Sequence, residues 1–160
     1  KYYNIKMLKR IITLLLLMSI SSCGYNAIYS KKNLINSDFS ITSLNFAGNR
    51  DINLKLKEKL NSLTLIKKDK KFELKISSFE KKEILAKNIS GDPLSFKTTI
   101  IIEVKVLMEG KLKNSLQIVE DFNYNNDDNK FNLKKYERQI RNNLANNATE
   151  RLIQKLSNIQ

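Results

Sequence analysis

The 160-residue chain contains no histidine and no tryptophan, and only one cysteine, one proline and four glycines. Without histidine it lacks the commonest general base and the commonest side-chain ligand of transition metals. Catalytic sets of serine, histidine and aspartate, or of cysteine and histidine, are therefore impossible. A single cysteine also excludes a disulfide within the chain and a cysteine-rich metal site. We accordingly expect a protein that is not an enzyme and that holds no metal and no cofactor.

Positive charge is in excess, with 29 lysines and arginines against 16 aspartates and glutamates and a net charge of +13. A basic surface of this kind can bind an anionic partner. It can equally follow from a genome rich in A and T, because the frequent residues lysine, asparagine and isoleucine have A/T-rich codons. Hydrophobic residues make up 41% of the chain, which is enough for a packed core. The length suits one domain.

Residues 1–22 have the organisation of an export signal peptide. Lys9 and Arg10 precede an apolar run over residues 11–18, and small residues follow it. A transmembrane helix is the alternative, but residues 11–20 would rise only about 15 Å as a helix, half of the roughly 30 Å of a bilayer core. Met7 fits as the true start, with residues 1–6 as an upstream extension.

Cys23 ends a segment that resembles a bacterial lipobox, with the aliphatic Ile20 and the small Ser21 and Ser22 before it. Small residues let a peptidase reach the peptide bond, and a thiol can form a thioether to diacylglycerol. We therefore predict a covalent lipid on Cys23 that anchors the mature chain to a membrane without spanning it. An incidental cysteine near an ordinary cleavage site is the alternative. Gly24, which is not aspartate, indicates the outer membrane by the sorting pattern of such lipoproteins.

The next segments are predicted as a tether, a strand and a helix. Residues 23–38 are polar and lack a pattern, which indicates a lipidated tether, and residues 39–46 are rich in strand-forming side chains. After a break at residues 48–49, apolar residues recur at the helical steps of four, four and three. These residues are Ile52, Leu56, Leu60 and Leu63. Leu54 does not fit on the same face.

Three strands follow, in which apolar residues occupy alternate positions. The strands cover residues 72–85, 98–108 and 116–124, with turn sequences at residues 90–93 and 109–111. A charged connector, Lys67-Lys68-Asp69-Lys70-Lys71, separates the helix from the first of these strands.

A long amphipathic helix closes the chain. Its apolar residues, at steps of three and four, are Leu133, Tyr136, Ile140, Leu144, Ala148, Leu152, Leu156 and Ile159. Its other face carries Arg138, Arg141, Asn142, Asn146 and Arg151. Such a basic helix could lie on a membrane surface. Packing on the sheet is the favoured interpretation, because the strands need a cover for their apolar face.

Together the elements predict an α+β fold for residues 39–160, with a four-stranded mixed sheet and two helices packed on one face. The first strand, the first helix and the second strand would form a right-handed crossover between parallel strands. The last three strands would run antiparallel as hairpins.

Residues 23–29, Cys-Gly-Tyr-Asn-Ala-Ile-Tyr, resemble the mature start of the lipopolysaccharide-assembly lipoproteins, the LptE family in its alphaproteobacterial form. Ala27 stands where that family often has proline. The order of elements, the turn at Gly110 and the closing helix are also similar. The resemblance implies an outer-membrane lipoprotein, facing the periplasm or inside a barrel, with no enzyme activity. It would plug an LptD-type β-barrel translocon, help this barrel to assemble and aid the delivery of lipopolysaccharide to the outer leaflet.

An anionic glycolipid would need a dense basic cluster, because salt screens charges separated by more than about 8 Å. In the predicted topology, the connector at residues 67–71 and the hairpin turn at residues 109–111 lie at the same end of the sheet. Their lysines, which we predict as contacts to lipopolysaccharide phosphate groups, are Lys67, Lys68, Lys70, Lys71, Lys111 and Lys113. The opposite end gathers a sparser group, Lys87, Lys97, Lys130, Lys134 and Lys135. A solvated surface without a ligand is the alternative for either group.

Three other functions are alternatives to this one. An auxiliary lipoprotein of an ABC-type lipid or solute transport system would share the anchor and the α+β domain. Nucleic-acid binding is suggested by charge alone, and we expect none, because an exported lipoprotein rarely meets nucleic acid and the aromatic residues lie on apolar strand faces. Catalysis would depend on the adjacent pairs Glu120-Asp121 and Asp127-Asp128, which we expect to be solvated.

Overall fold

A computed structural model describes residues 37–159. The predicted signal peptide, Cys23 and the tether up to residue 36 lie outside the described residues. The elements, in chain order, are β1 (Phe39–Gly48), α3 (Arg50–Thr64), β2 (Lys70–Lys87), β3 (Pro93–Met108), β4 (Lys111–Asn125) and α4 (Lys130–Ser157). All six elements belong to one compact unit.

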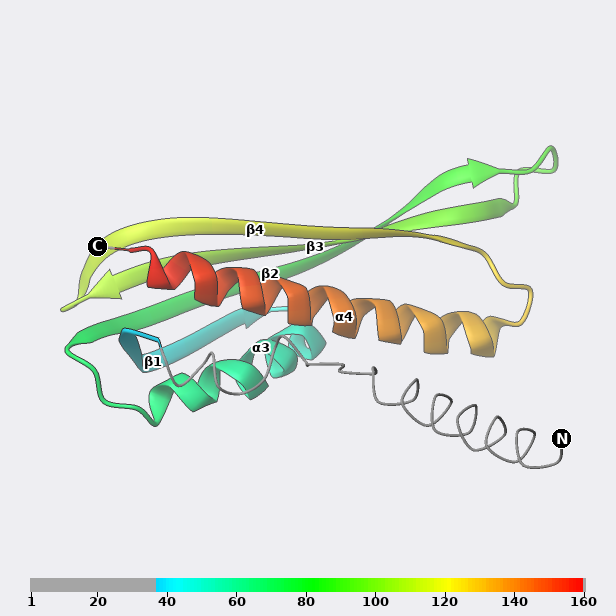
Figure 1. The fold of residues 1–160 in the computed structure, drawn as a ribbon. Helices are drawn as coiled ribbons and strands as arrows, with labels where there is room; N and C mark the ends of the chain where they lie inside the picture. Colours follow the sequence, from blue (N-terminus) through cyan, green and yellow to red (C-terminus); the bar gives the residue numbers. More distant parts are fainter. Residues whose placement is uncertain (1–36, 160) are drawn as a thin grey trace, which may run out of the picture. The chain divides into compact units, whose positions relative to one another are not determined.

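The strands form one mixed sheet in the order β1-β2-β3-β4. β1 pairs with β2 in parallel, and the pairs β2–β3 and β3–β4 are antiparallel. α3 makes the crossover between the two parallel strands, and α3 and α4 lie on the same face of the sheet (Figure 1). This arrangement confirms the predicted α+β fold with a four-stranded mixed sheet and two helices on one face.

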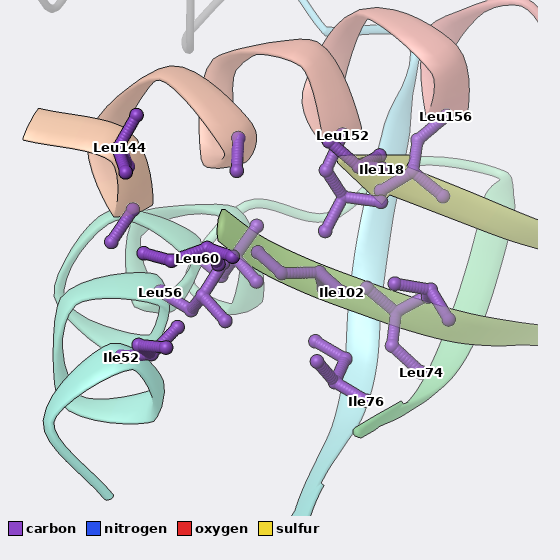
Figure 2. Packing of buried hydrophobic residues seen from close by; sticks show 14 of the residues in the cluster. Ile52, Leu56, Leu60, Leu74, Ile76, Ile102, Ile118, Leu144, Leu152 and Leu156 are labelled. Carbon is purple, nitrogen blue, oxygen red and sulfur yellow. The ribbon is translucent and has the colours of Figure 1, made fainter. Parts of the chain in front are cut away.

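The two helices bury the inner face of the sheet. The four apolar residues that predicted α3 are all buried. Figure 2 shows three of them, Ile52, Leu56 and Leu60, in one cluster with Ile102 of the sheet and Leu144 of α4. Each aliphatic side chain that is fully buried contributes about 1.5–3 kcal/mol relative to leaving it in water. This one-sided core therefore supplies most of the stability of the fold.

An asparagine caps the first turn of each helix. The Asn49 side chain accepts hydrogen bonds from the backbone N–H groups of Asp51 (3.0 Å) and Ile52 (3.2 Å). The Asn129 side chain accepts from the backbone N–H group of Phe131 (3.0 Å). Both caps satisfy donors that have no partner within the helix, which fixes where each helix begins.

The turn from β1 into α3 lies against the backbone of β2. Gly48 has a φ of +91°, and a Cβ atom there would lie 2.0 Å from the Ser78 carbonyl oxygen. The Asn49 N–H group donates to this same oxygen at 2.9 Å. The Ser78 hydroxyl donates to Asn53 Oδ1 at 2.7 Å. Because only glycine fits at position 48, this contact determines how α3 leaves the strand.

Some details differ from the sequence-based expectation. Lys70 and Lys71, predicted in the connector, belong to β2. Tyr136 and Phe122, predicted on apolar faces, are 44% and 45% exposed. Both lie in the half of the molecule where charged side chains fill part of the space between the sheet and α4, as described below.

Replacement of Gly48 by alanine should destabilise the protein strongly, because the new Cβ atom would collide with the Ser78 carbonyl at an unfavourable φ. We expect the free energy of unfolding to fall by about 3 kcal/mol or more. Gly91 has a similar φ of +88° but no atom within 4 Å of the added Cβ. Gly91→Ala should therefore cost only about 1–2 kcal/mol. Urea denaturation followed by circular dichroism measures the free energy of unfolding of both variants. Equal losses would contradict the interpretation that the contact with Ser78 requires glycine at position 48.

Candidate functional site

The lysines predicted to contact phosphate lie at one end of the sheet. Glu73 near the start of β2 pairs with Leu107 near the end of β3, and Met108 pairs with Lys111 at the start of β4. Figure 1 shows the start of β2 and the β3–β4 hairpin at the same end. We call this the basic end of the sheet. Its lysines are Lys67, Lys68, Lys70, Lys71, Lys111 and Lys113.

The β3–β4 hairpin closes with two residues in the left-handed region, Glu109 (φ 52°) and Gly110 (φ 73°). Two positive φ values in a two-residue loop are the mark of a type I′ turn, whose twist matches that of the strands. The predicted turn over residues 109–111 is therefore a tighter one over residues 109–110. As a result β4 begins with Lys111 at the tip of the basic end.

Most of these lysines have no acidic partner. Within residues 37–159, Lys70 alone of the six forms an ion pair, with Asp38 at 3.4 Å. The Lys70 ammonium also lies 5.8 Å from the centre of the Phe72 ring. The other five side chains make no ion pair in the described part of the chain. Their ammonium groups are available to phosphate as point charges, without the bidentate geometry of arginine.

The second group of lysines is less available. Lys97 forms an ion pair with Asp121, and the hydrogen bond it donates there raises the pKa of Lys97. The Lys130 ammonium lies 3.4 Å from Asn126 Oδ1 and 3.3 Å from the Asp127 carbonyl oxygen. Two of the five lysines are therefore engaged locally. The structure thus favours the first group as a place for an anion.

A polar network that the sequence did not indicate lies between the sheet and the first half of α4. The Lys82 ammonium lies 2.5 Å from Glu137 Oε1 and 3.9 Å from the centre of the Phe96 ring. The Tyr124 hydroxyl donates to the same Glu137 oxygen at 3.0 Å and lies 3.3 Å from the Thr98 hydroxyl. These contacts link three elements through one carboxylate.

The network shifts two pKa values upward. Burial disfavours the charged form of Lys82, but the hydrogen bond to Glu137 and the attraction of Tyr124 and Glu137 outweigh it, so the pKa of Lys82 is raised. Burial is the main cause that raises the pKa of Tyr124. Both groups therefore hold their protons more firmly in the folded protein than in the unfolded chain.

Two arginines predicted on the face of the closing helix opposite its apolar residues reach carboxylates of the sheet. Arg141 Nε donates to Glu80 Oε2 at 2.7 Å, and this bond is the main cause that raises the pKa of Arg141. Arg151 Nη1 lies 3.0 Å from Glu120 Oε1. Both carboxylates project from the inner face of the sheet. These arginines neutralise inner-face charges and do not serve as free surface cations.

Three of the four carboxylates in the two adjacent acidic pairs, Glu120-Asp121 and Asp127-Asp128, are engaged by such contacts. Glu120 faces Arg151, Asp121 pairs with Lys97, and Asp127 accepts from the Asn129 N–H group at 2.8 Å. Within residues 37–159, no three acidic, cysteine or histidine side chains are grouped so that they could hold a metal ion. None of the helices in this part of the chain is long and apolar enough to cross a membrane.

A cavity of about 610 Å³ lies beside the loop between β4 and α4. It is lined by Asn125, Asn126, Asp127, Asp128, Asn132, Leu133 and Tyr136. Its two aspartates do not suit an anion, and none of the predicted lysines lines it. This cavity is therefore not the predicted phosphate site.

The fold places the chain in a class of two-layer α+β domains in which a crossover precedes an antiparallel meander and a long closing helix. Solved structures that share it include rare lipoprotein B from Shewanella oneidensis, with a TM-score of 0.57 and 14% identity over 72% of this chain and 93% of that one. The minor lipoprotein from Acinetobacter baumannii matches with a TM-score of 0.54 and 12% identity over 72% of this chain and 90% of that one.

A third structure, a candidate lipoprotein from Caulobacter crescentus, matches with a TM-score of 0.52 and 13% identity over 79% of this chain and 90% of that one. At such identities the likeness establishes the fold alone. No protein-family model and no curated protein sequence matches the chain.

The Glu137→Gln variant tests the polar network. It should lower the free energy of unfolding by about 1–2 kcal/mol at neutral pH, because Lys82 and Tyr124 lose their shared acceptor. Groups with a raised folded-state pKa stabilise the protein below about pH 10 and lose this effect as the pH rises through their folded-state pKa values. The wild type should therefore lose more stability than the variant between about pH 9 and pH 12.

The matched control for this variant is Glu103→Gln, which removes an exposed carboxylate without a partner in the described residues. It should leave the alkaline profile unchanged. Denaturation at a series of pH values measures all three proteins. Parallel profiles for the wild type and Glu137→Gln would contradict the assignment.

Proposed function

We propose that the chain is an outer-membrane lipoprotein, anchored by a covalent lipid on Cys23, that plugs and helps to assemble an LptD-type β-barrel and so aids delivery of lipopolysaccharide to the outer leaflet. The observation that carries the proposal is the fold, since solved chains matched over 93% and 90% of their own length are lipoproteins. The lipobox that ends at Cys23 supports the anchor independently, because it is read from the sequence alone.

The outer face of the sheet supports a role inside a barrel. Across β2, β3 and β4 this face carries side chains of both charges and neutral polar groups, among them Glu73, Lys75, Glu103, Lys105 and Gln117. Large membrane barrels have polar, water-filled interiors. The same outer face also carries one apolar cross-strand row, Phe79, Ile101 and Val119. A domain that buries most of its apolar side chains under two helices and presents a mainly polar outer face is compatible with such a lumen.

The basic end of the sheet is the part of the domain that would meet lipopolysaccharide phosphates. Of its five lysines without an ion pair in the described residues, three lie on strands β2 and β4, and Lys67 and Lys68 lie in the connector before β2. Attraction between exposed charges is weak for each pair and grows with the number of pairs. The site would therefore hold a multiply charged anion better than a single phosphate.

The variant Lys67→Glu, Lys68→Glu, Lys71→Glu should weaken lipopolysaccharide binding at physiological salt by about tenfold or more, because three favourable contacts become repulsive. Lys70 is left in place because it pairs with Asp38. The variant Lys130→Glu, Lys134→Glu, Lys135→Glu carries the same change in net charge and should bind like the wild type. Surface plasmon resonance on immobilised lipopolysaccharide measures the affinity of both variants. An equal loss of affinity in both would show that net charge, and not the basic end of the sheet, determines binding.

Affinity purification of the lipidated protein from detergent-solubilised envelopes tests the barrel partnership. We expect an outer-membrane β-barrel to co-purify in a fixed ratio. The Cys23→Ala variant should recover much less of it, because the chain is then not anchored beside the barrel. Recovery of an inner-membrane permease instead would favour the alternative function, an auxiliary lipoprotein of an ABC-type lipid or solute transport system.

A further inference from the structure

A groove of about 300 Å³ runs between the end of β1 and the first half of α3. It is lined by Phe46, Ala47, Gly48, Arg50, Asn53, Leu54 and Lys57. The start of β1 pairs with Lys70, so the groove lies at the opposite end of this strand from the basic end of the sheet. It is therefore a separate site.

The groove has an apolar strip formed by Phe46, Ala47 and Leu54. Phe46 packs partly against the core, whereas Leu54 is 54% exposed. Leu54 is the residue that did not fit the buried face of its helix, and nothing in the core requires it. The ten residues of β1, which forms the other wall, include no charged side chain. An alkyl chain would thus lie along an apolar strip between β1 and Leu54 of α3.

The walls of the groove are fixed before any ligand arrives. The Asn53 side-chain amide donates to the Ala47 carbonyl oxygen at 3.1 Å, and its Oδ1 atom accepts from the Ser78 hydroxyl at 2.7 Å. Gly48 packs against the backbone of the same serine. Because these bonds tie α3 to both β1 and β2, the distance between the walls does not depend on an occupant.

Two cations flank the apolar strip. Arg50 and Lys57 are seven residues apart on α3, about 10.5 Å along the helix axis. Neither forms an ion pair within residues 37–159, although both acids of the helix do. Asp51 lies 3.7 Å from an arginine of α4, and Glu58 lies 2.9 Å from Lys55. Positive charge is thus left uncompensated on the groove side of α3.

We infer that this groove binds one alkyl chain that carries a phosphate head group. The chain would lie along Phe46, Ala47 and Leu54, and the phosphate would bind Arg50 or Lys57. The planar guanidinium of Arg50 can hold two phosphate oxygens at once, which the lysines of the basic end cannot do. The inference rests on the proposed function only for the source of the ligand, an anionic glycolipid of the outer membrane.

The probe is decyl phosphate below its micelle-forming concentration, titrated into residues 33–160 and followed by isothermal calorimetry. All six described elements lie in this part of the chain, in one compact unit, and a solved chain of the same fold matches over 93% of its own length. We expect saturable binding of one ligand per protein. Hexyl phosphate should bind at least about tenfold more weakly, because it buries fewer methylene groups. Decyl maltoside, which has no charge, should bind about tenfold more weakly, and inorganic phosphate should not bind.

Two variants and their matched controls locate the site. Leu54→Ser and the double variant Arg50→Gln, Lys57→Gln should each weaken decyl phosphate binding by about tenfold. Leu65→Ser, which changes a leucine that is 84% exposed beyond the groove, and Lys134→Gln, Lys135→Gln, which changes two exposed lysines of α4, should bind like the wild type. All four proteins change exposed side chains, so circular dichroism should show an unchanged fold.

Three results would overturn the inference: no binding of decyl phosphate, equal binding of inorganic phosphate, or equal binding by the groove variants. A groove made for an extended polypeptide would give the first result. Retained co-purification of the barrel with the Leu54→Ser protein would then leave the proposed function standing. If no barrel co-purifies with the protein but decyl phosphate still binds, the proposed function is refuted and the groove remains a binding site.

Discussion

The contact between α4 and the inner face of the sheet is the constraint on which the rest of the structure depends. In the second half of α4, Leu152 and Leu156 lie beside Ile118 of the sheet (Figure 2). In its first half, Glu137 and Arg141 neutralise charged groups that project from the same face. One helix thus covers an apolar and a charged half of a single sheet. Partners can therefore bind only surfaces that α4 leaves uncovered, which include the outer face of the sheet, its basic end and the β1–α3 groove.

These remaining surfaces differ in chemistry. The basic end presents flexible ammonium groups at the tips of strands and suits a large, multiply charged anion. The groove combines an apolar strip with a guanidinium and suits one amphiphilic ligand of limited size. A glycolipid with several phosphates and several acyl chains has both kinds of group. The two sites, at opposite ends of β1, are compatible with contact to one such molecule or to two.

Periodicity predicted the elements because each of them has one buried side. The steps of Ile52 and Leu56 gave the buried face of α3, and strict alternation gave β3 with its pairing. Periodicity did not predict the contacts that long side chains make. Helical position placed Arg141 on the face opposite the apolar residues, yet its long side chain lets the guanidinium reach Glu80 on the sheet. The groove was not foreseen, because Leu54 marks a surface between two elements whose distance no local pattern specifies. The lipid on Cys23 stays a prediction.

That lipid is the central claim of the account, since an anchored plug and a glycolipid ligand both require delivery to the outer membrane. Mass spectrometry of the protein purified from its native host tests it most directly. The account predicts a mature chain that begins at Cys23, with a mass increased by a thioether-linked diacylglycerol and an amide-linked acyl chain. A free thiol at Cys23 with the leader still attached would contradict it.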